Sequence, residues 1–333
     1  MKKELLDFIC CPICKQDLTL SVESKNFEEI ISGNLNCETC KQEWRIERGI
    51  PYFLPIKNIN KEQVVSETSK KYSYIWKKNN TVHRKTTRHI ERVEKHFGEN
   101  CFNKKTGLDA GSGNGEDTAY LAKKYPHLNL LSLDVSEGVY ETYARCKNFS
   151  NVHVIRGSVL NLPIKDECLE FVYSYGVLHH TTAPFKGFKE FSRALKYDGQ
   201  CFLYLYEDHK DNLIKFLPLK IISLLRNIST KVPEKLLYFI CVIFSPIIVI
   251  FFSWPAILLR QFKFSKSFSE KIPFNFSTGL FSLRADLYDR FSAPREFRFS
   301  KETIIDWYEK ENFENITVDK FKDIAGWMSK GEK

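Results

Sequence analysis

Short apolar runs alternate with helical patterns through the middle of the chain. TGLDA, NLLSLD, VHVIRG, LEFVYSY and QCFLYLY are each apolar and followed by a turn or helix signal, which is typical of buried strands. EDTAYLAKKY and PFKGFKEFSRALK have helical spacing, and Asp198-Gly199 predicts a turn before the last of these strands. Strands that alternate with helices predict an α/β fold with a mostly parallel sheet covered on both faces.

The last block of the chain returns to a helix and two strands. SKETIIDWYEKENF predicts a helix with Ser300 as its N-cap, and NITVDKF and IAGWMSK predict strands. Before them, RADLYDRFSAPREFRFS mixes arginines and aspartates with aromatic residues. Two interpretations fit this run equally well: a loop that folds over a substrate, or a solvated cluster of charges that pair with one another.

Between these blocks lies an apolar stretch, residues 236–259, with 24 residues and no charge. It is long enough to cross a bilayer as a helix. A single crossing would leave strands of one sheet on opposite sides of the membrane, so we expect the stretch to return to the side it came from. Pro246 and Pro255 predict breaks that favour a re-entrant or interfacial hairpin.

The charge of the chain is unevenly distributed. The net charge is +9, and the excess lies in residues 61–105 (12 basic, 5 acidic) and 209–271 (10 basic, 3 acidic). In the second block Lys215, Lys220 and Arg226 stand among leucines and isoleucines, a pattern that suits an anionic lipid surface. We therefore expect peripheral membrane contact through residues 213–262. The alternative is a helical lid over an apolar pocket, or a dimer interface, in a soluble protein.

Length and composition limit the class of protein. With 333 residues, 43% of them apolar, the chain can form two domains or one domain with a large addition, and it is not disordered. Its ten cysteines and the absence of an apolar stretch near the start argue against a secretory signal and a disulfide scaffold. We expect a reduced, cytoplasmic protein, peripheral at the inner face of the cell membrane.

Two cysteine pairs near the start have the spacing of a metal site. Cys11-x-x-Cys14 and Cys37-x-x-Cys40 predict two knuckles whose four thiolates bind one tetrahedral Zn²⁺. All four ligands come from the protein, so the metal is expected to be structural. A ribbon of about 50 residues needs such a metal to fold. The alternative is that the cysteines form two reduced pairs or disulfides.

The run from Thr106 to Gly115, TGLDAGSGNG, predicts a strand, a tight turn and a helix. Gly111, Gly113 and Gly115 allow the backbone to approach a ligand closely. Asp109 before the first glycine suits a cationic amino group and repels a diphosphate. Asp134 ends the next strand, where a carboxylate can accept both ribose hydroxyls or simply cap a helix. These features favour S-adenosylmethionine over a dinucleotide.

Two parts of the chain resemble known families. The CPxC, CxxC and GIPxxLP elements of residues 1–55 resemble the small zinc-ribbon domain that is fused to, or partners, many methyltransferases, like the activator subunit of tRNA methyltransferases. The glycine loop, Asp134 and RGSVLNLPIKDECLEFVYSYGVLHH resemble class I S-adenosylmethionine-dependent methyltransferases of the methyltransferase-11, quinone C-methyltransferase-like branch. This second resemblance covers about residues 106–206.

The resemblance implies a Rossmann-like seven-stranded methyltransferase sheet preceded by a small zinc ribbon. It implies three parts: a ribbon (1–55), a helical connector that covers the cofactor site (56–105), and a methyltransferase domain (106–333) with an apolar helical insert (209–271). Gly111, Gly113 and Gly115 would line the methionine and ribose, Asp109 would face the amino group, and Asp134 the ribose. Ser158 and Val159 would edge the adenine, although an aspartate is more usual at position 158. Tyr175, Gly176 and His179 would lie beside the sulfonium.

Methyl transfer asks little of the protein, because the sulfonium is already activated and the reaction is mainly a matter of positioning. A base is needed only when the nucleophile arrives protonated. His179 or His180 could take that proton. The alternative is that VLHH packs against the cofactor and the sheet without transferring protons.

Three functions compete. The first is methylation of a small-molecule or lipid-linked acceptor, and the second is methylation of an RNA base, as in rRNA methyltransferases with a similar ribbon. The third is a non-catalytic binding module. The ribbon carries 8 basic and 9 acidic residues over 1–60, which is unfavourable for phosphate contact. The intact glycine loop argues against the third function. The acceptor atom and the oligomeric state do not follow from the sequence.

Overall fold

The computed structural model describes residues 1–54, 70–74, 89–210, 213–269, 272, 280–320 and 326–333. These residues form two compact units. Unit 1 comprises the described residues within 1–206 and 297–333, and unit 2 comprises those within 207–296. Most of the predicted connector, residues 55–69 and 75–88, lies outside the described residues.

Unit 1 begins with a small antiparallel sheet in the order β1-β2-β3-β4, preceded by the short helix η1 (Lys3–Asp7). Its strands are β1 (Thr19–Asn26), β2 (Glu29–Cys37), β3 (Gln42–Glu47) and β4 (Ile50–Pro51). Cys37 ends β2, and Leu35, Trp44 and Ile46 are buried. The alternation of buried and exposed side chains along β2 and β3 gives this ribbon one apolar face.

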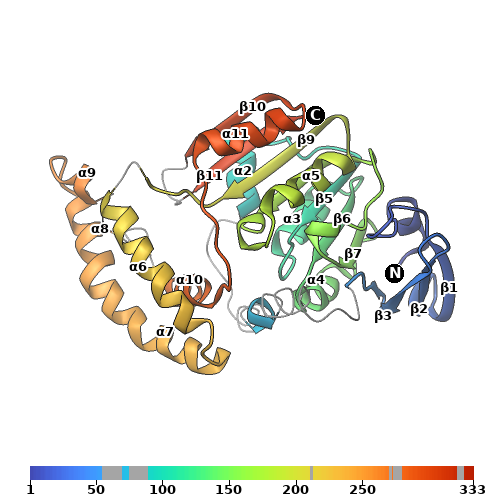
Figure 1. Ribbon diagram of the computed structural model, residues 1–333, viewed down its shortest axis with the longest axis horizontal. Coiled ribbons are helices and arrows are strands. Elements are labelled where there is room, and N and C mark those ends of the chain that lie inside the picture. The colour runs from blue at the N-terminus through green and yellow to red at the C-terminus, as the bar shows by residue number, and fades with distance from the viewer. Residues whose placement is uncertain (55–69, 75–88, 211–212, 270–271, 273–279, 321–325) are drawn as a thin grey trace. The chain divides into compact units, whose positions relative to one another are not determined.

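A seven-stranded sheet in the order β10-β11-β9-β8-β5-β6-β7 forms the rest of unit 1 (Figure 1). β5 to β9 pair in parallel, and β10 and β11 are antiparallel. The strands are β5 (Thr106–Ala110), β6 (Asn129–Asp134), β7 (Val152–Arg156), β8 (Leu169–Tyr175), β9 (Leu195–Leu205), β10 (Glu314–Lys320) and β11 (Trp327–Glu332). The predicted Rossmann-like α/β fold is confirmed.

The helices of unit 1 follow the strands as a parallel sheet requires. They are α2 (His89–Phe97), α3 (Glu116–Lys124), α4 (Gly138–Cys146), η2 (Val159–Asn161), η3 (Leu178–His180), α5 (Pro184–Ala194) and α11 (Lys301–Lys310). Ser300 is the N-cap of α11, as predicted: its Oγ accepts a hydrogen bond from Thr303 N at 3.3 Å. The predicted turn at Asp198-Gly199 falls within the bounds of β9, which begins at Leu195 and not after the turn. The chain is irregular at this position, because Asp198 has φ +62° and the pairing of β9 with β8 shifts between Leu195 and Gln200.

Unit 2 is helical. It contains α6 (Leu213–Ser229), α7 (Glu234–Ile248), the π-helical turn η4 (Val249–Ser253), α8 (Trp254–Arg260), α9 (Lys266–Ser269) and α10 (Leu280–Ser292). α10 packs against α6 and α7. The Arg226 guanidinium pairs with the Glu296 carboxylate at 2.8 Å, and both side chains are buried. Of the run 284–300, residues 284–292 belong to α10 and residues 293–298 lie outside any helix or strand, so the loop interpretation is wrong for the first half of the run.

The predicted hairpin at Pro246 and Pro255 is also wrong. Residues Glu234–Arg260 form one helix of 27 residues. Pro246 lacks the N–H that would bond to Val242 O, and the Ser245 hydroxyl donates to that carbonyl at 3.0 Å instead. The wider π-helical turn, in which Trp254 N bonds to Val249 O, accommodates Pro255. The helix thus accommodates both prolines without a break.

Candidate functional site

A cavity lies at the carboxyl ends of β5, β6 and β8, where a doubly wound sheet places its ligands. Its lining comes from six short segments of unit 1: Tyr72; Gly111; Leu133, Asp134 and Val135; Gly157, Ser158, Val159 and Leu160; Tyr175, Gly176 and Val177; and His180, Thr181 and Thr182. Of the predicted cofactor residues, Gly111, Asp134, Ser158, Val159 and Tyr175 line it. Asp109, Gly113 and Gly115 do not.

The glycine loop is shaped by its contacts within the protein. Gly111 has φ +99°, and a Cβ there would lie 2.1 Å from a methyl carbon of Val177. Gly115, at φ +76°, is the N-cap of α3, and a Cβ there would lie 2.7 Å from the Thr142 methyl. Glycine at both positions is therefore required by backbone conformation and by packing. At Gly111 it also keeps the cavity wall free of a side chain.

Asp134 ends β6 and holds the glycine loop in place. One carboxylate oxygen accepts a hydrogen bond from Gly113 N at 2.9 Å, and the other accepts one from Ser136 N at 2.7 Å. Each oxygen retains a second lone pair. Asp134 can thus cap the following turn and still accept ribose hydroxyls from a ligand in the cavity, so the two interpretations of this residue are compatible.

Asp109 is almost completely buried, and its carboxylate accepts a hydrogen bond from the Thr118 hydroxyl at 2.6 Å. Desolvation, opposed by that hydrogen bond and reinforced by Asp117 and Asp134, raises the pKa of Asp109 to about 8. Such a carboxyl is largely protonated at neutral pH. In this state Asp109 is not the carboxylate anion that the sequence analysis expects to face the amino group of the methionine part of the cofactor.

The adenine-side residues lie on the segment after β7. Ser158 is the N-cap of η2, and its hydroxyl accepts a hydrogen bond from Leu160 N at 3.2 Å. Ser158, Val159 and Leu160 all contribute to the cavity wall. The serine at the position where an aspartate is more usual is therefore used to shape the turn.

Tyr175 ends β8 in a column of stacked rings. Its ring lies 4.3 Å from that of Tyr204 on β9 and 4.2 Å from that of His89 on α2. Tyr72, also from the connector region, lines the cavity, and its ring lies 5.6 Å from that of His180. Sequence reasoning missed Tyr72 because no motif surrounds it.

The two adjacent histidines have different surroundings. His180 lines the cavity. His179 is fully buried and stacks on Tyr206 at 3.8 Å, and neither of its ring nitrogens has a hydrogen-bond partner among the described residues. Desolvation, with His180 and Arg298 nearby, lowers the pKa of His179 well below its usual value. His179 is thus a neutral ring in the core of unit 1.

The four predicted zinc ligands come together in the ribbon. The sulfur atoms of Cys11, Cys14, Cys37 and Cys40 all lie within 4.8 Å of one another. The Cys11–Cys40 and Cys14–Cys37 pairs are 3.5 and 3.3 Å apart. Tetrahedral Zn²⁺ with Zn–S bonds of about 2.3 Å requires sulfur atoms roughly 3.8 Å apart, so the arrangement fits the metal.

Comparison with known proteins identifies both parts of unit 1. Residues 108–203, which carry most of the cavity wall, match the family model described as a methyltransferase domain. The chain carries an S-adenosylmethionine-dependent methyltransferase domain. Residues 2–49 match the model described as Trm112p-like protein, so the ribbon is a Trm112-like domain. The two resemblances inferred from the sequence are thereby confirmed.

Individual relatives are distant. The chain is 28% identical over 127 residues to the malonyl-[acyl-carrier protein] O-methyltransferase of Nitrosospira multiformis, and this match spans 33% of the chain and 40% of that relative. A complex of the Haloferax volcanii Trm112 methyltransferase activator and a methyltransferase is similar over 80% of this chain and 96% of that one, at 12% identity and a TM-score of 0.45. An Aquifex aeolicus S-adenosylmethionine-dependent methyltransferase is similar over 73% and 88%, at 16% identity and a TM-score of 0.39.

Proposed function

We propose that this protein transfers a methyl group from S-adenosylmethionine to a small-molecule or lipid-linked acceptor at a membrane surface. The observation that carries the methyl-transfer proposal is that Asp134 lines the same cavity as Ser158 and the side-chain-free backbone of Gly111. These residues fit the adenosine part of the cofactor.

In this proposal Asp134 accepts the ribose hydroxyls, and Ser158 and Val159 form the edge of the adenine site. When bound, S-adenosylmethionine would supply an activated methyl group: the acceptor forms a bond to the methyl carbon, the S–CH3 bond breaks in line, and the sulfur leaves with the electron pair as S-adenosylhomocysteine. The apolar lining, Leu133, Val135, Val159, Leu160 and Val177, excludes water from the wall. Exclusion of water favours methyl transfer to the acceptor over hydrolysis of S-adenosylmethionine.

His180 is the proposed proton acceptor for a hydroxyl or amine acceptor, because it lines the cavity. The buried His179 would support its neighbour by packing. If the acceptor arrives already deprotonated, neither ring needs to take a proton from it. His180→Asn should then leave turnover within about threefold, whereas loss of a required general base costs roughly 10²-fold or more.

Mass spectrometry of the methylated product identifies the acceptor. Extracts of small molecules and lipids, incubated with the protein and methyl-deuterated S-adenosylmethionine, should give a product heavier by one labelled methyl group. Asp134→Ala serves as the control with weakened cofactor binding and should give less labelled product. No labelled product in extracts, with labelled product in RNA alone, would overturn the small-molecule proposal.

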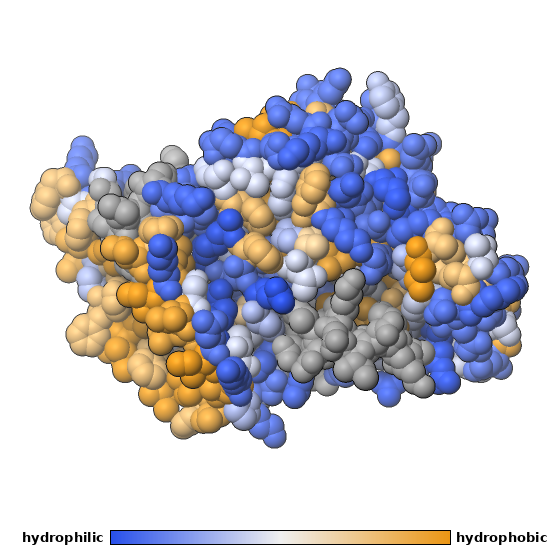
Figure 2. All heavy atoms as spheres, viewed as in Figure 1, coloured by the Kyte–Doolittle hydropathy of each residue, from blue (hydrophilic) through white to orange (hydrophobic). Residues whose placement is uncertain are grey.

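The membrane part of the proposal rests on unit 2. Among the described residues, one helix, Glu234–Arg260, is long and apolar enough to cross a membrane. Only 22% of its most apolar stretch of 18 residues is buried. Figure 2 shows apolar side chains gathered over α6, α7 and α8. The exposed ones include Leu224, Ile228, Phe239, Phe244, Ile247, Phe251, Trp254 and Leu258. A water-facing surface of this kind is rare in monomeric soluble proteins.

The sheet limits how this helix can meet a bilayer. β9 precedes it and β11 follows it, and these strands are direct neighbours in one sheet. A single crossing would separate them, so we propose that α6, α7 and α8 lie in one leaflet, with the exposed Lys220, Lys231, Lys235, Lys263 and Lys266 near the head groups. Arg226, buried against Glu296, takes no part in this contact.

Vesicle flotation tests this contact. The wild type should float with phosphatidylserine-containing vesicles at low salt, and Phe251→Glu should abolish flotation by placing a charge on the apolar surface. Phe251 is 69% exposed, and Phe27→Glu, at a ribbon position that is 95% exposed, is the matched control. A wild type that stays in the soluble fraction would make the surface a lid or an oligomer contact.

The proposed location is the cytoplasmic face of the cell membrane. No disulfide joins any of the ten cysteines, which suits a reducing compartment. Methylation of an RNA base is the second candidate, because the chain carries a Trm112-like domain and the basic excess of residues 61–105 could contact phosphates. Binding of tRNA or rRNA with steep salt dependence would favour it.

A further inference from the structure

One wall of the cavity is held by the ribbon. Gly157, Ser158, Val159 and Leu160 form this wall, and the ribbon contacts the chain on both sides of it. Before the wall, Tyr52 pairs with Arg156 in a parallel bridge, and Phe53 N donates to Arg156 O at 2.7 Å. The ribbon thus continues the edge of the large sheet next to β7.

After the wall, the start of the ribbon makes a second set of backbone contacts. Ile9 and Ile164 form an antiparallel bridge, Cys10 N donates to Pro163 O at 3.2 Å, and Lys165 N donates to Phe8 O at 2.8 Å. The wall therefore spans two anchor points, both of which belong to the ribbon.

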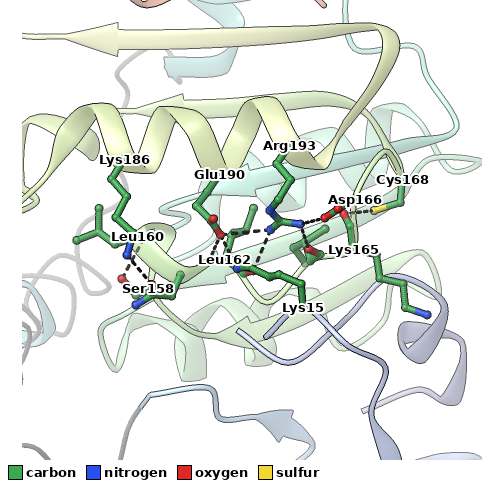
Figure 3. A network of polar contacts seen from close by, with 12 residues as sticks. Lys15, Ser158, Leu160, Leu162, Lys165, Asp166, Cys168, Lys186, Glu190 and Arg193 are labelled. Atoms are coloured by element: carbon green, nitrogen blue, oxygen red, sulfur yellow. Dashed lines mark hydrogen bonds and ion pairs between the residues drawn. The ribbon is translucent and has the colours of Figure 1, made fainter. Parts of the chain in front are cut away.

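A third contact reaches Leu162, between the wall and the second anchor point, through a single side chain (Figure 3). Lys15 Nζ donates to Leu162 O at 3.0 Å and to Glu190 Oε2 at 2.7 Å. The same Glu190 oxygen accepts a hydrogen bond from Leu162 N at 2.7 Å. Both backbone polar groups of Leu162, two residues after the cavity-lining Leu160, are thus fixed by one ion pair.

This ion pair is partly shielded from water. The side chains of Lys15 and Glu190 are 24% and 15% exposed, and Arg193 also donates to Glu190 and to Leu162 O. Shielded, hydrogen-bonded pairs contribute more than exposed ones because water screens them less. The network can therefore stabilise the backbone conformation at Leu162 more than an exposed ion pair would.

The position of Lys15 is set by the cysteine cluster. Lys15 follows Cys14, its N–H donates to Cys11 O at 2.8 Å, and its φ is +62°. A lysine adopts this left-handed conformation only when its surroundings impose it. The first knuckle thus directs the lysine side chain toward Leu162.

We propose that Lys15 is a positioning residue that couples the cysteine cluster to the adenine end of the cofactor cavity. It acts through Glu190 and Leu162 and touches no ligand itself. Without its ammonium group the turn that carries Ser158, Val159 and Leu160 loses one of its fixed points, and adenosine compounds bind less tightly. This inference rests on the proposed S-adenosylmethionine site.

The competing explanation is that Lys15 merely fastens the ribbon to the sheet. A nearby ion pair separates the two explanations. Asp17 pairs with Lys165 Nζ at 2.7 Å, so it also joins the ribbon to the rest of unit 1, but it touches neither Leu162 nor the cavity wall. Asp17→Asn is therefore the control for losing a ribbon contact that does not reach Leu162, although this pair is more exposed than the Lys15 pair.

The experiment measures binding by calorimetry with two probes, S-adenosylhomocysteine and 5′-methylthioadenosine, which lacks the amino-acid part. Lys15→Met should weaken both probes by the same factor, about tenfold, because the lost contact lies at the adenine end. Lys15→Arg, which can still donate to Leu162 O and Glu190, should bind both within about threefold of wild type. Asp17→Asn should bind both like wild type.

Three results would overturn the inference: unchanged affinity in Lys15→Met, a loss confined to S-adenosylhomocysteine, or an equal loss in Asp17→Asn. The thermal unfolding midpoint of each variant is measured alongside. If Lys15→Met does not fold, Glu190→Gln takes its place, since the amide oxygen still accepts from Leu162 N but the ion pair is lost. A wild type that binds neither probe would instead refute the proposed cofactor site.

Discussion

Asp134 combines two tasks in one carboxylate, since it fixes Gly113 and Ser136 and also faces the cavity. Asp134→Ala should weaken S-adenosylmethionine binding by roughly tenfold or more, because it removes charge-assisted hydrogen bonds to the ribose and frees the glycine loop. Titration calorimetry measures this. Asp134→Asn, which keeps an oxygen but loses the charge, should lie between alanine and wild type. Unchanged affinity in the alanine variant would remove Asp134 from the site.

Asp109 gives unit 1 a characteristic pH dependence. Its pKa is about 8 in the folded protein and about 3.8 when unfolded, so between these values the folded state binds the extra proton. The contribution to stability is complete below the unfolded pKa and is lost as pH rises toward 8. Asp109→Asn should therefore flatten the decline of the unfolding midpoint between pH 5 and 8. A decline as steep as that of the wild type would contradict the assignment.

At the level of residues, the sequence could predict those that belong to motifs. The four cysteines and Asp134 were identified because their spacing or strand position is diagnostic. The choice between His179 and His180 could not be made, because they lie in the single turn η3, where neither a helical nor a strand period says which ring faces the cavity. Tyr72 reaches the cavity only through tertiary folding.

At the level of elements, apolar runs located the five parallel strands, β5 to β9, since buried parallel strands are nearly continuous in apolar residues. α4 (Gly138–Cys146) was missed because it begins at a glycine and no capping side chain marks its start. A proline inside a helix predicts a break because it lacks the N–H that would bond to the carbonyl four residues earlier. This prediction fails at Pro246, because the Ser245 hydroxyl donates to Val242 O instead.

This replacement can be tested. Ser245 is fully buried, and Ser245→Ala should lower the free energy of unfolding of unit 2 by about 1 kcal/mol, because Val242 O loses its donor. Ser223 in α6 makes a similar bond to Leu219 O but is exposed to water. Ser223→Ala should therefore change the stability by less than about 0.5 kcal/mol. Urea unfolding of the two variants measures the difference, and equal effects would refute the role of Ser245.

At the scale of the whole molecule, the ribbon and the large sheet share one apolar core. Leu5, Ile9 and Leu35 of the ribbon belong to the same buried cluster as Leu133 and Ile164. The ribbon boundary at residue 55 and the connector stay predictions, because residues 55–69 lie outside the part of the chain that the structure describes. A sequence pattern assigns residues to elements but does not show which elements share a core.

This shared core makes the metal important beyond the ribbon. Reduced wild-type protein should contain close to one equivalent of zinc, and Cys37→Ser should lower both the zinc content and the unfolding midpoint of unit 1. Cys168→Ser, at a cysteine outside the cluster, is the control and should keep its zinc. Zinc content is measured by atomic emission. Wild-type protein with under about half an equivalent would count against the site.

The neighbours β9 and β11 are separated in the chain by the whole of unit 2, yet they pair from Leu205–Trp327 to Gln200–Glu332. During synthesis β9 must therefore wait, with one edge unpaired, until all of the insert has left the ribosome. Throughout that interval the nascent chain presents both an open strand edge and the exposed apolar face of α6, α7 and α8, the two features that most invite aggregation. Early binding of these helices to a lipid surface would cover their apolar face while the edge of β9 is still unpaired. Chains truncated before residue 326 should consequently accumulate as insoluble material, even though they contain the complete cysteine cluster and every residue of the cavity wall.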